Sequence, residues 1–218
     1  MINLEGAMIN KTSTLMTVSA GLMALATSAS AAIIDFTDLA TGTSGDVLGV
    51  SWNLTSSGVL NNAQGYDGAL PTPPADWELA LDRDGYGVGD DEISYIDTSE
   101  WVKITFDSWV KVSAVAFLDL FLGTSTQEVA YATDNYGTIT QVDSTFAPFL
   151  GGGFAEADVD SVWIKSLVFT VADGNDPYGN ADGALAGIEV AAVPIPAAGF
   201  MLLGALGGLT AIRRRKKA

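Results

Sequence analysis

The chain has 218 residues, and its 10 lysine and arginine residues against 26 aspartate and glutamate residues give a formal net charge of −16 at pH 7. It contains no cysteine and no histidine. These counts exclude a disulfide scaffold, a cysteine-ligated metal, a thiol nucleophile and a Ser-His-Asp triad formed by this chain alone. The excess of acid also argues against binding to nucleic acid, because such binding requires lysine and arginine to neutralise phosphates.

The N-terminal residues have the pattern of a secretory signal peptide. One lysine precedes an apolar stretch at 15–26, and small residues follow at Ala29 and Ala31. A basic segment, a short apolar segment and a small-x-small site are the three parts that signal peptidase recognises. We therefore expect residues 1–31 to be removed by cleavage after Ala31, with translation starting at Met1 or Met8.

Residues 32–190 form the predicted folded domain. They carry 25 acidic residues against four basic ones, a balance of −21, so the exported part is more acidic than the whole chain. About 160 residues are enough for one hydrophobic core. No long linker divides the segment, and the short proline-rich stretch at 71–74 reads as a surface loop.

Apolar residues in this domain alternate with polar ones at a period of two, which is typical of half-buried strands. In the longest such run, every second residue from Val110 to Leu122 is apolar, which predicts one continuous buried face. We expect strands at 32–36, 49–54, 77–81, 93–96, 101–106, 110–122, 128–133, 138–142, 163–171 and 184–190. About ten short strands separated by polar turns predict an all-β fold, a jelly-roll-like β-sandwich; a sheet closed on itself is the alternative.

An acidic loop between two predicted strands is the candidate metal site. It carries five carboxylates, with three glycines at alternate positions between them: Asp82, Asp84, Asp90, Asp91 and Glu92. Hard oxygen ligands on a flexible loop suit Ca²⁺. The loop is not an EF-hand, because Tyr86 and Ile93 occupy ligand positions of that motif. A solvated hairpin loop in an acidic protein is the simpler interpretation, and both stay open.

The C-terminal segment 191–218 has the pattern of a membrane anchor. Residues 191–212 carry no charge, and five consecutive arginines and lysines follow at 213–217. An apolar stretch of this length spans a bilayer, and the basic cluster fixes its own flank in the cytoplasm. Because two prolines near its start disfavour helix, we expect one transmembrane helix over 197–212, with the domain before it outside the cytoplasm.

The same segment resembles a known bacterial sorting signal. A short proline motif, an apolar helix and a terminal basic cluster occur in order, and the motif reads Val193, Pro194, Ile195, Pro196 and Ala197. This is similar to the PEP-CTERM signal, in particular to its Val-Pro-Leu-Pro-Ala (VPLPA-CTERM) variant, with Ile195 in place of leucine. The resemblance implies a Gram-negative bacterial protein that is anchored in the inner membrane and cut near the motif by an exosortase. The mature chain then reaches the cell surface or the extracellular matrix of a biofilm.

These observations predict an exported, non-catalytic surface or matrix protein. The alternative is a calcium-supported carbohydrate-binding module associated with exopolysaccharide, in which the five tryptophans would stack on sugars rather than pack in the core. A glycoside hydrolase needs only two carboxylates, so the lack of histidine does not exclude one. Among 25 acidic residues, however, some suitable pair arises by chance, and the sequence indicates no particular catalytic residue.

Overall fold

The structure is a computed structural model of the 218-residue chain. It describes residues 31–191, apart from the internal positions 63–64, 67, 90–91, 96–99, 124–125, 148–149, 161–162, 173–174 and 177–178. The predicted signal peptide except for Ala31, the proline motif Val193–Ala197 and the predicted C-terminal helix lie outside the described residues. Within the described part there is no helix with the length and apolar character needed to cross a membrane.

The described residues form antiparallel β-strands and one short 3₁₀ turn, which confirms the all-β prediction. In chain order the elements are β1 (Ala32–Asp35), β2 (Ser44–Val47), β3 (Val50–Ser56), β4 (Leu60–Asn61), β5 (Gly87–Val88), β6 (Ile93–Ser94), β7 (Val102–Leu118), β8 (Val129–Asp134), β9 (Ile139–Asp143), η1 (Gly151–Gly153), β10 (Ala155–Asp158), β11 (Ile164–Val171), β12 (Asn175–Asp176), β13 (Gly179–Asn180) and β14 (Asp182–Ala191).

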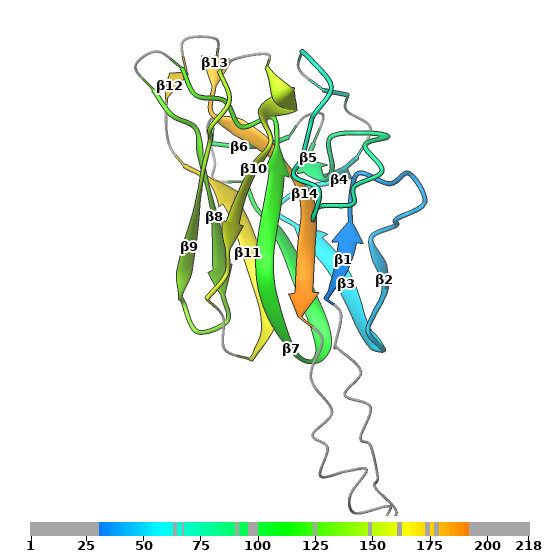
Figure 1. Ribbon diagram of the computed structural model, residues 1–218. Coiled ribbons are helices and arrows are strands. Elements are labelled where there is room, and N and C mark those ends of the chain that lie inside the picture. The colour runs from blue at the N-terminus through cyan, green and yellow to red at the C-terminus, as the bar shows by residue number, and fades with distance from the viewer. Residues whose placement is uncertain are drawn as a thin grey trace, which may run out of the picture. The chain divides into compact units, whose positions relative to one another are not determined.

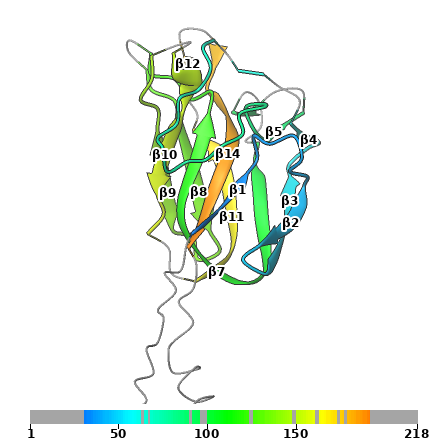
Figure 2. The same cartoon turned by 45° about the vertical axis from the view of Figure 1, so that its right-hand side comes forward.

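The 17-residue strand β7 joins two layers (Figure 1). Its first part, residues 102–106, pairs with β3 and β11, in a sheet of order β2-β3-β7-β11-β8-β9. Its second part pairs with β14 and β10, in a sheet of order β1-β14-β7-β10. Between them β7 bends, and Figures 1 and 2 show the two halves of the strand in different layers. The sequence predicts two separate strands here, because residues 107–109 at the bend break the alternation.

The main core lies between these two layers. Its largest fully buried side chains are aromatic and aliphatic, and the rings meet edge to face: Phe117 lies 5.9 Å from Phe169, and Phe36 lies 5.6 Å from Trp52. Edge-to-face pairs at this distance add stability beyond the apolar area that they bury.

A second apolar cluster covers the outer face of the β1-β14-β7-β10 sheet. Trp77 packs there against Ala114, Ala116 and Ala186. The covering segment is residues 71–81, and the predicted strand at 77–81 is wrong, because those residues are irregular. The backbone of this segment instead donates hydrogen bonds to side chains in and next to β1. For example, Ala80 N donates to Asp35 Oδ2 at 2.6 Å.

The predicted continuous face of Val110 to Leu122 is also wrong, and a β-bulge explains why. In the pairing with β14, Val190 faces Val112 whereas Glu189 faces Ala114, so Ser113 is an extra residue. Because one inserted residue moves every later side chain to the opposite face, Val112 belongs to the inner core and Ala114 to the outer cluster. The later half of β7 is therefore buried on both faces.

Candidate functional site

Residues of the predicted acidic loop separate into different environments. Asp82 is exposed, and its Oδ2 accepts a long bond of 3.4 Å from the backbone of Leu39. Asp84 and Glu92 are buried, with 1% and 8% of their surface accessible. Asp90 and Asp91 lie outside the described residues. The structure thus brings two of the five predicted ligands inward and leaves one at the surface.

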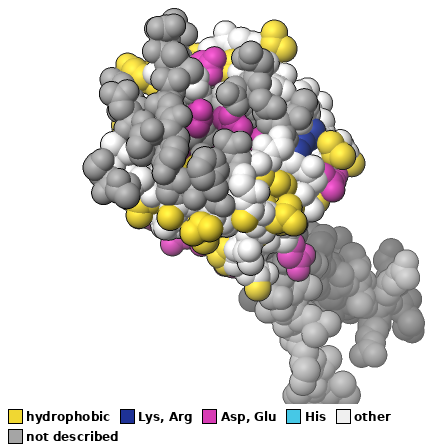
Figure 3. All heavy atoms as spheres, turned by 90° about the horizontal axis from the view of Figure 1, so that it is seen from above, with side chains coloured by type: hydrophobic (Ala, Val, Ile, Leu, Met, Phe, Trp, Pro, Cys, Tyr) yellow, Lys and Arg dark blue, Asp and Glu magenta, His cyan; other side chains and the backbone are white. Residues whose placement is uncertain are grey.

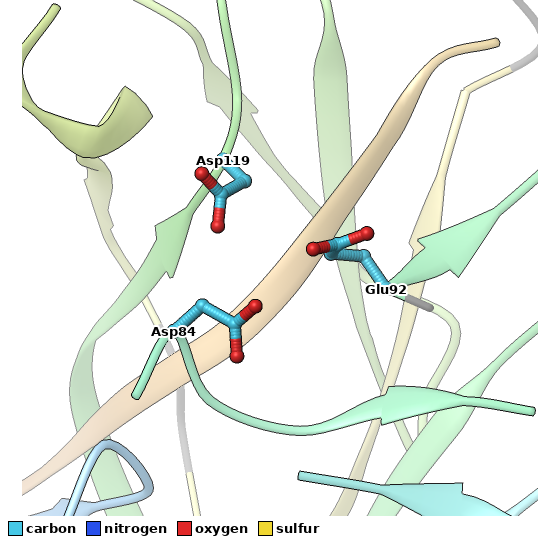
Figure 4. Close-up of side chains that lie close together, drawn as sticks. All are labelled: Asp84, Glu92 and Asp119. Atoms are coloured by element: carbon cyan, nitrogen blue, oxygen red, sulfur yellow. The ribbon is translucent and has the colours of Figure 1, made fainter. Parts of the chain in front are cut away.

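A third carboxylate, which the sequence analysis did not single out, completes a cluster. Asp119 follows directly after β7, is 3% accessible and joins Asp84 and Glu92 so that one oxygen of each lies within 4.8 Å of the others. We call these three residues the carboxylate triad. Figure 4 shows the three side chains converging from separate segments, with β14 passing beside them.

Two of the three segments are fixed on β14. Tyr86 and Leu185 exchange two backbone hydrogen bonds of 3.0 Å, and β6, which follows Glu92, pairs with the start of β14. Gly85 makes this close approach possible. Its φ is +139°, and a Cβ at this position would lie 2.2 Å from the carbonyl oxygen of Leu185. Only glycine fits here, so Asp84 is held beside β14 by its neighbour's lack of a side chain.

The third segment is held by the 3₁₀ turn η1. The backbone N–H groups of Asp119 and Leu120 donate to the carbonyl oxygens of Gly152 and Gly153 at 3.0 and 3.1 Å. The N–H of the next residue, Phe121, donates to the buried carboxylate of Glu128 at 2.6 Å. Asp119 has a φ of +59°, a left-handed conformation that aspartate tolerates better than most residues. The backbone around all three carboxylates is therefore fixed.

The one buried cation beside the triad, among the described residues, is directed mainly at backbone. Arg83 lies with its guanidinium 5.2 Å from the ring centre of Tyr86. It donates to four carbonyl oxygens, those of Phe36, Asp38, Thr41 and Asn62. Figure 3 shows the end of the domain that holds the triad. Acidic side chains reach the surface there in several places, and basic atoms form a single small patch.

The pKa of Tyr66 is affected by the negative charge of the carboxylate triad. Its hydroxyl donates to the carbonyl oxygen of Arg83 at 2.9 Å. Burial raises the pKa of Tyr66 well above its usual value, and the nearby carboxylates of Asp84 and Asp119 raise it further. Three carboxylates so close together repel one another, and a bound cation would relieve that repulsion.

The triad has the donor chemistry that Ca²⁺ requires. Three carboxylates supply three to about six oxygens, and Ca²⁺ takes about six to eight, completed by carbonyl groups or water. A sequence signal for Asp119 did exist: it is the one charged residue in the apolar run from Ala114 to Leu122. That signal cannot indicate which loops meet Asp119, because the contacts arise from β14, more than 60 residues later in the chain.

A shallow cleft lies on the outer face of the β1-β14-β7-β10 sheet. It has a volume of about 310 Å³ and is lined by Trp77, Glu156, Asp158, Asp76 and Glu189, among others. The indole N–H of Trp77 donates to the carboxylate of Glu156. With only 6% of its surface accessible, Trp77 forms a wall of the cleft rather than an open stacking face.

Comparison with known proteins adds no relative. No family model matches the chain, and neither the search of curated proteins nor that of solved structures found a match.

Proposed function

We propose that the chain is an exported, non-catalytic surface or matrix protein, released or transferred by cleavage at a PEP-CTERM-like signal. Signal peptidase removes residues 1–31, the segment 197–212 anchors the chain in the inner membrane, and an exosortase cuts near Val193–Ala197. The mature protein begins at Ala32 and consists mainly of the described domain, and the pairing of its first strand with its last supports assignment to the jelly-roll class.

The pairing of β1 with β14 carries this proposal. β1 starts at Ala32, directly after the predicted cleavage site, and Ala32 pairs with Val190 near the end of β14. The strand pairings of the described domain therefore need no residue before Ala32 or after Ala191. Removal of both signals would leave every strand pair among the described residues intact, as a domain that matures by cleavage at both ends requires.

The experiment is to express the full chain in a host that carries an exosortase and to measure the mature mass. We expect a chain that begins at Ala32 and ends near the proline motif. The matched variant Pro194→Ala, Pro196→Ala should keep its C-terminal segment. An identical, uncut C-terminus in the original chain and in the variant would overturn the processing proposal.

We also propose that the carboxylate triad holds a structural Ca²⁺, which replaces the predicted set Asp82, Asp84, Asp90, Asp91 and Glu92 by Asp84, Glu92 and Asp119. Convergence of three buried carboxylates supports this assignment. Calorimetric titration of the calcium-free protein with Ca²⁺ should show one binding site. The variant Asp119→Asn should lose that site. Asparagine tolerates the left-handed backbone conformation of residue 119 as aspartate does, so the variant should still fold.

A carbohydrate-binding module that uses exopolysaccharide is the second candidate. The cleft beside Trp77 supports it, because carboxylates such as Glu156 and Asp158 accept hydrogen bonds from sugar hydroxyl groups. A glycan array screened with and without a calcium chelator tests it. Binding that is weakened by Glu156→Gln would favour this function, whereas no binding in either condition would remove it.

A further inference from the structure

The end of the domain opposite the carboxylate triad carries a group of exposed apolar and aromatic side chains. Each has between 45% and 62% of its surface accessible. We call this group the aromatic end; it consists of Leu48, Trp109, Tyr136, Ile139 and Trp163. Trp109 and Trp163 are the two tryptophans that are exposed among the described residues.

Strand pairing gathers these residues around the bend of β7. Trp109 lies at the bend itself, and Trp163 precedes Ile164, which pairs with Val110. Tyr136 lies in the β8–β9 turn and Ile139 is the first residue of β9. The turn is joined to β11 by Asn135, whose Oδ1 accepts the backbone N–H of Lys165 at 2.7 Å.

Leu48 lies at the same end of the domain, on the side of β3. It lies in the β2–β3 turn, and because Trp52 pairs with Phe106, that turn extends past Phe106 towards the bend. Figure 1 shows the bend, the β2–β3 turn and the β8–β9 turn at the same end of the molecule.

Rings and lysines lie together at this end. The rings of Trp109 and Tyr136 are nearly parallel, at 15°, with their centres 6.2 Å apart. Lys165 Nζ lies 5.6 Å from the ring centre of Trp109 and donates to the carbonyl oxygen of Asp107 at 3.2 Å. Lys111 is exposed two residues beyond Trp109. Two of the four basic residues in an otherwise acidic domain are therefore at this end.

The chain leaves the domain at the aromatic end. Ala191, the last residue of β14, pairs with Lys111. The predicted membrane helix starts at Ala197, six residues later, and six extended residues span at most about 20 Å. An anchored chain thus keeps this end close to the bilayer, so even weak contacts with lipid are made at high effective concentration.

We propose that the aromatic end is a membrane-docking surface, on which Trp109, Tyr136 and Trp163 enter the lipid headgroup region and Lys111 and Lys165 contact lipid phosphates. Tryptophan and tyrosine are enriched at membrane interfaces because their rings are apolar with a polar edge. Lysine places its charge among the phosphates while its stem stays in apolar surroundings. This inference rests on the proposed anchoring. It adds an orientation, in which the carboxylate triad faces away from the membrane and the proline motif is held at the bilayer surface.

The test uses the full chain in vesicles of phosphatidylcholine and phosphatidylglycerol that contain a doxyl-labelled lipid quencher. Because the chain has no cysteine, one fluorophore is placed by Ile139→Cys at the aromatic end or by the control Leu150→Cys, next to η1 at the other end. These residues have similar accessibility, 62% and 57%. We expect quenching at position 139 to be at least twofold stronger than at position 150. Adding Trp109→Ser and Trp163→Ser should remove most of the difference.

Flotation of the vesicles distinguishes failure of the proposed anchoring from failure of the proposed docking. A chain that does not float with the vesicles overturns the proposed anchoring, and the docking with it. A chain that floats but is quenched equally at both positions overturns the docking alone. A change in the Ile139→Cys signal caused by a soluble anionic polysaccharide, without lipid-dependent quenching, would assign the aromatic end to sugars and also overturn the docking.

Discussion

The two ends of the sandwich are built on opposite physical principles. At the end that holds the carboxylate triad, polar groups are buried and the backbone is fixed by close contacts, such as those of Gly85 with β14. At the aromatic end, apolar side chains are exposed around a bend and two turns. β14 connects the two, since it begins beside the triad and ends beside the bend, about 30 Å away for a strand of this length.

This difference indicates which end requires a partner for stability and which offers a surface to one. Buried carboxylates are unfavourable unless their charge is compensated, so we expect the stability of the fold to depend on what surrounds the three carboxylates. Exposed aromatic residues bury further apolar surface when a partner covers them, so a group of them marks an interaction surface. We therefore expect perturbation of the carboxylate end to change unfolding, and perturbation of the aromatic end to change association.

Glycine-to-alanine substitutions at the two ends should differ most. Gly85→Ala places a methyl group against the backbone of Leu185 in a left-handed conformation, and we expect a loss of about 3 kcal/mol or more. Gly137→Ala, in the β8–β9 turn, also has a positive φ, +85°, but no atom lies within 4 Å of the new methyl group. It should cost only about 1–2 kcal/mol. Urea unfolding measures both, and equal losses would contradict the close approach at Gly85.

Calcium should distinguish two aspartates of the same loop. If the triad binds Ca²⁺ in the folded state only, calcium at 100 times its dissociation constant adds about 2.7 kcal/mol, a rise in melting temperature of several degrees. Asp84→Asn should abolish this rise, whereas Asp82→Asn, which changes an exposed side chain, should retain it. A melting temperature that is unchanged by millimolar calcium in the unsubstituted protein would overturn the calcium proposal.

The sequence predicted the strands well and the triad only in part, for a physical reason. Alternation at a period of two is a local signal, and it located the strands of both sheets except the short β2 and β10. The bulge at Ser113 is not visible in that pattern, because an alanine-rich run reads as apolar on either face. The predicted strand at 77–81 failed for the converse reason: its apolar residues cover a sheet without joining it.

The triad depended on contacts between distant segments. Asp84 and Glu92 stood out because the loop between them is dense in carboxylates, and that density is local. Asp119 comes from the end of β7 and meets the other two only because β14 pairs with β6 on one side and with β7 on the other. Nothing in the local sequence distinguishes buried Asp84 from exposed Asp82, which lies two residues away.

Truncating the rings at the aromatic end should have a smaller effect on unfolding. We expect Trp109→Ala and Tyr136→Ala each to lower stability by about 1 kcal/mol, with a coupling of about 0.5–1.5 kcal/mol between them, because the stacked pair is exposed. Trp52→Ala in the core is the contrast, at about 3–5 kcal/mol. A double-mutant cycle by urea unfolding measures the coupling, and a coupling near zero would show that the two rings do not stabilise each other.

The smallest expected effect concerns pH at the carboxylate end. The pKa of Tyr66 is raised in the folded protein, so above about pH 10 the unfolded chain releases this proton while the folded chain keeps it. Stability should therefore fall as pH rises from 9 to 11, by about 1 kcal/mol or less from this group after solvent screening. Tyr66→Phe should reduce the fall. Bound Ca²⁺ would neutralise Asp84 and Asp119 and bring the pKa of Tyr66 down, so calcium should shrink the difference between Tyr66→Phe and the unsubstituted protein. Unfolding curves at both pH values, with and without calcium, measure this, and a difference that calcium leaves unchanged would separate Tyr66 from the triad.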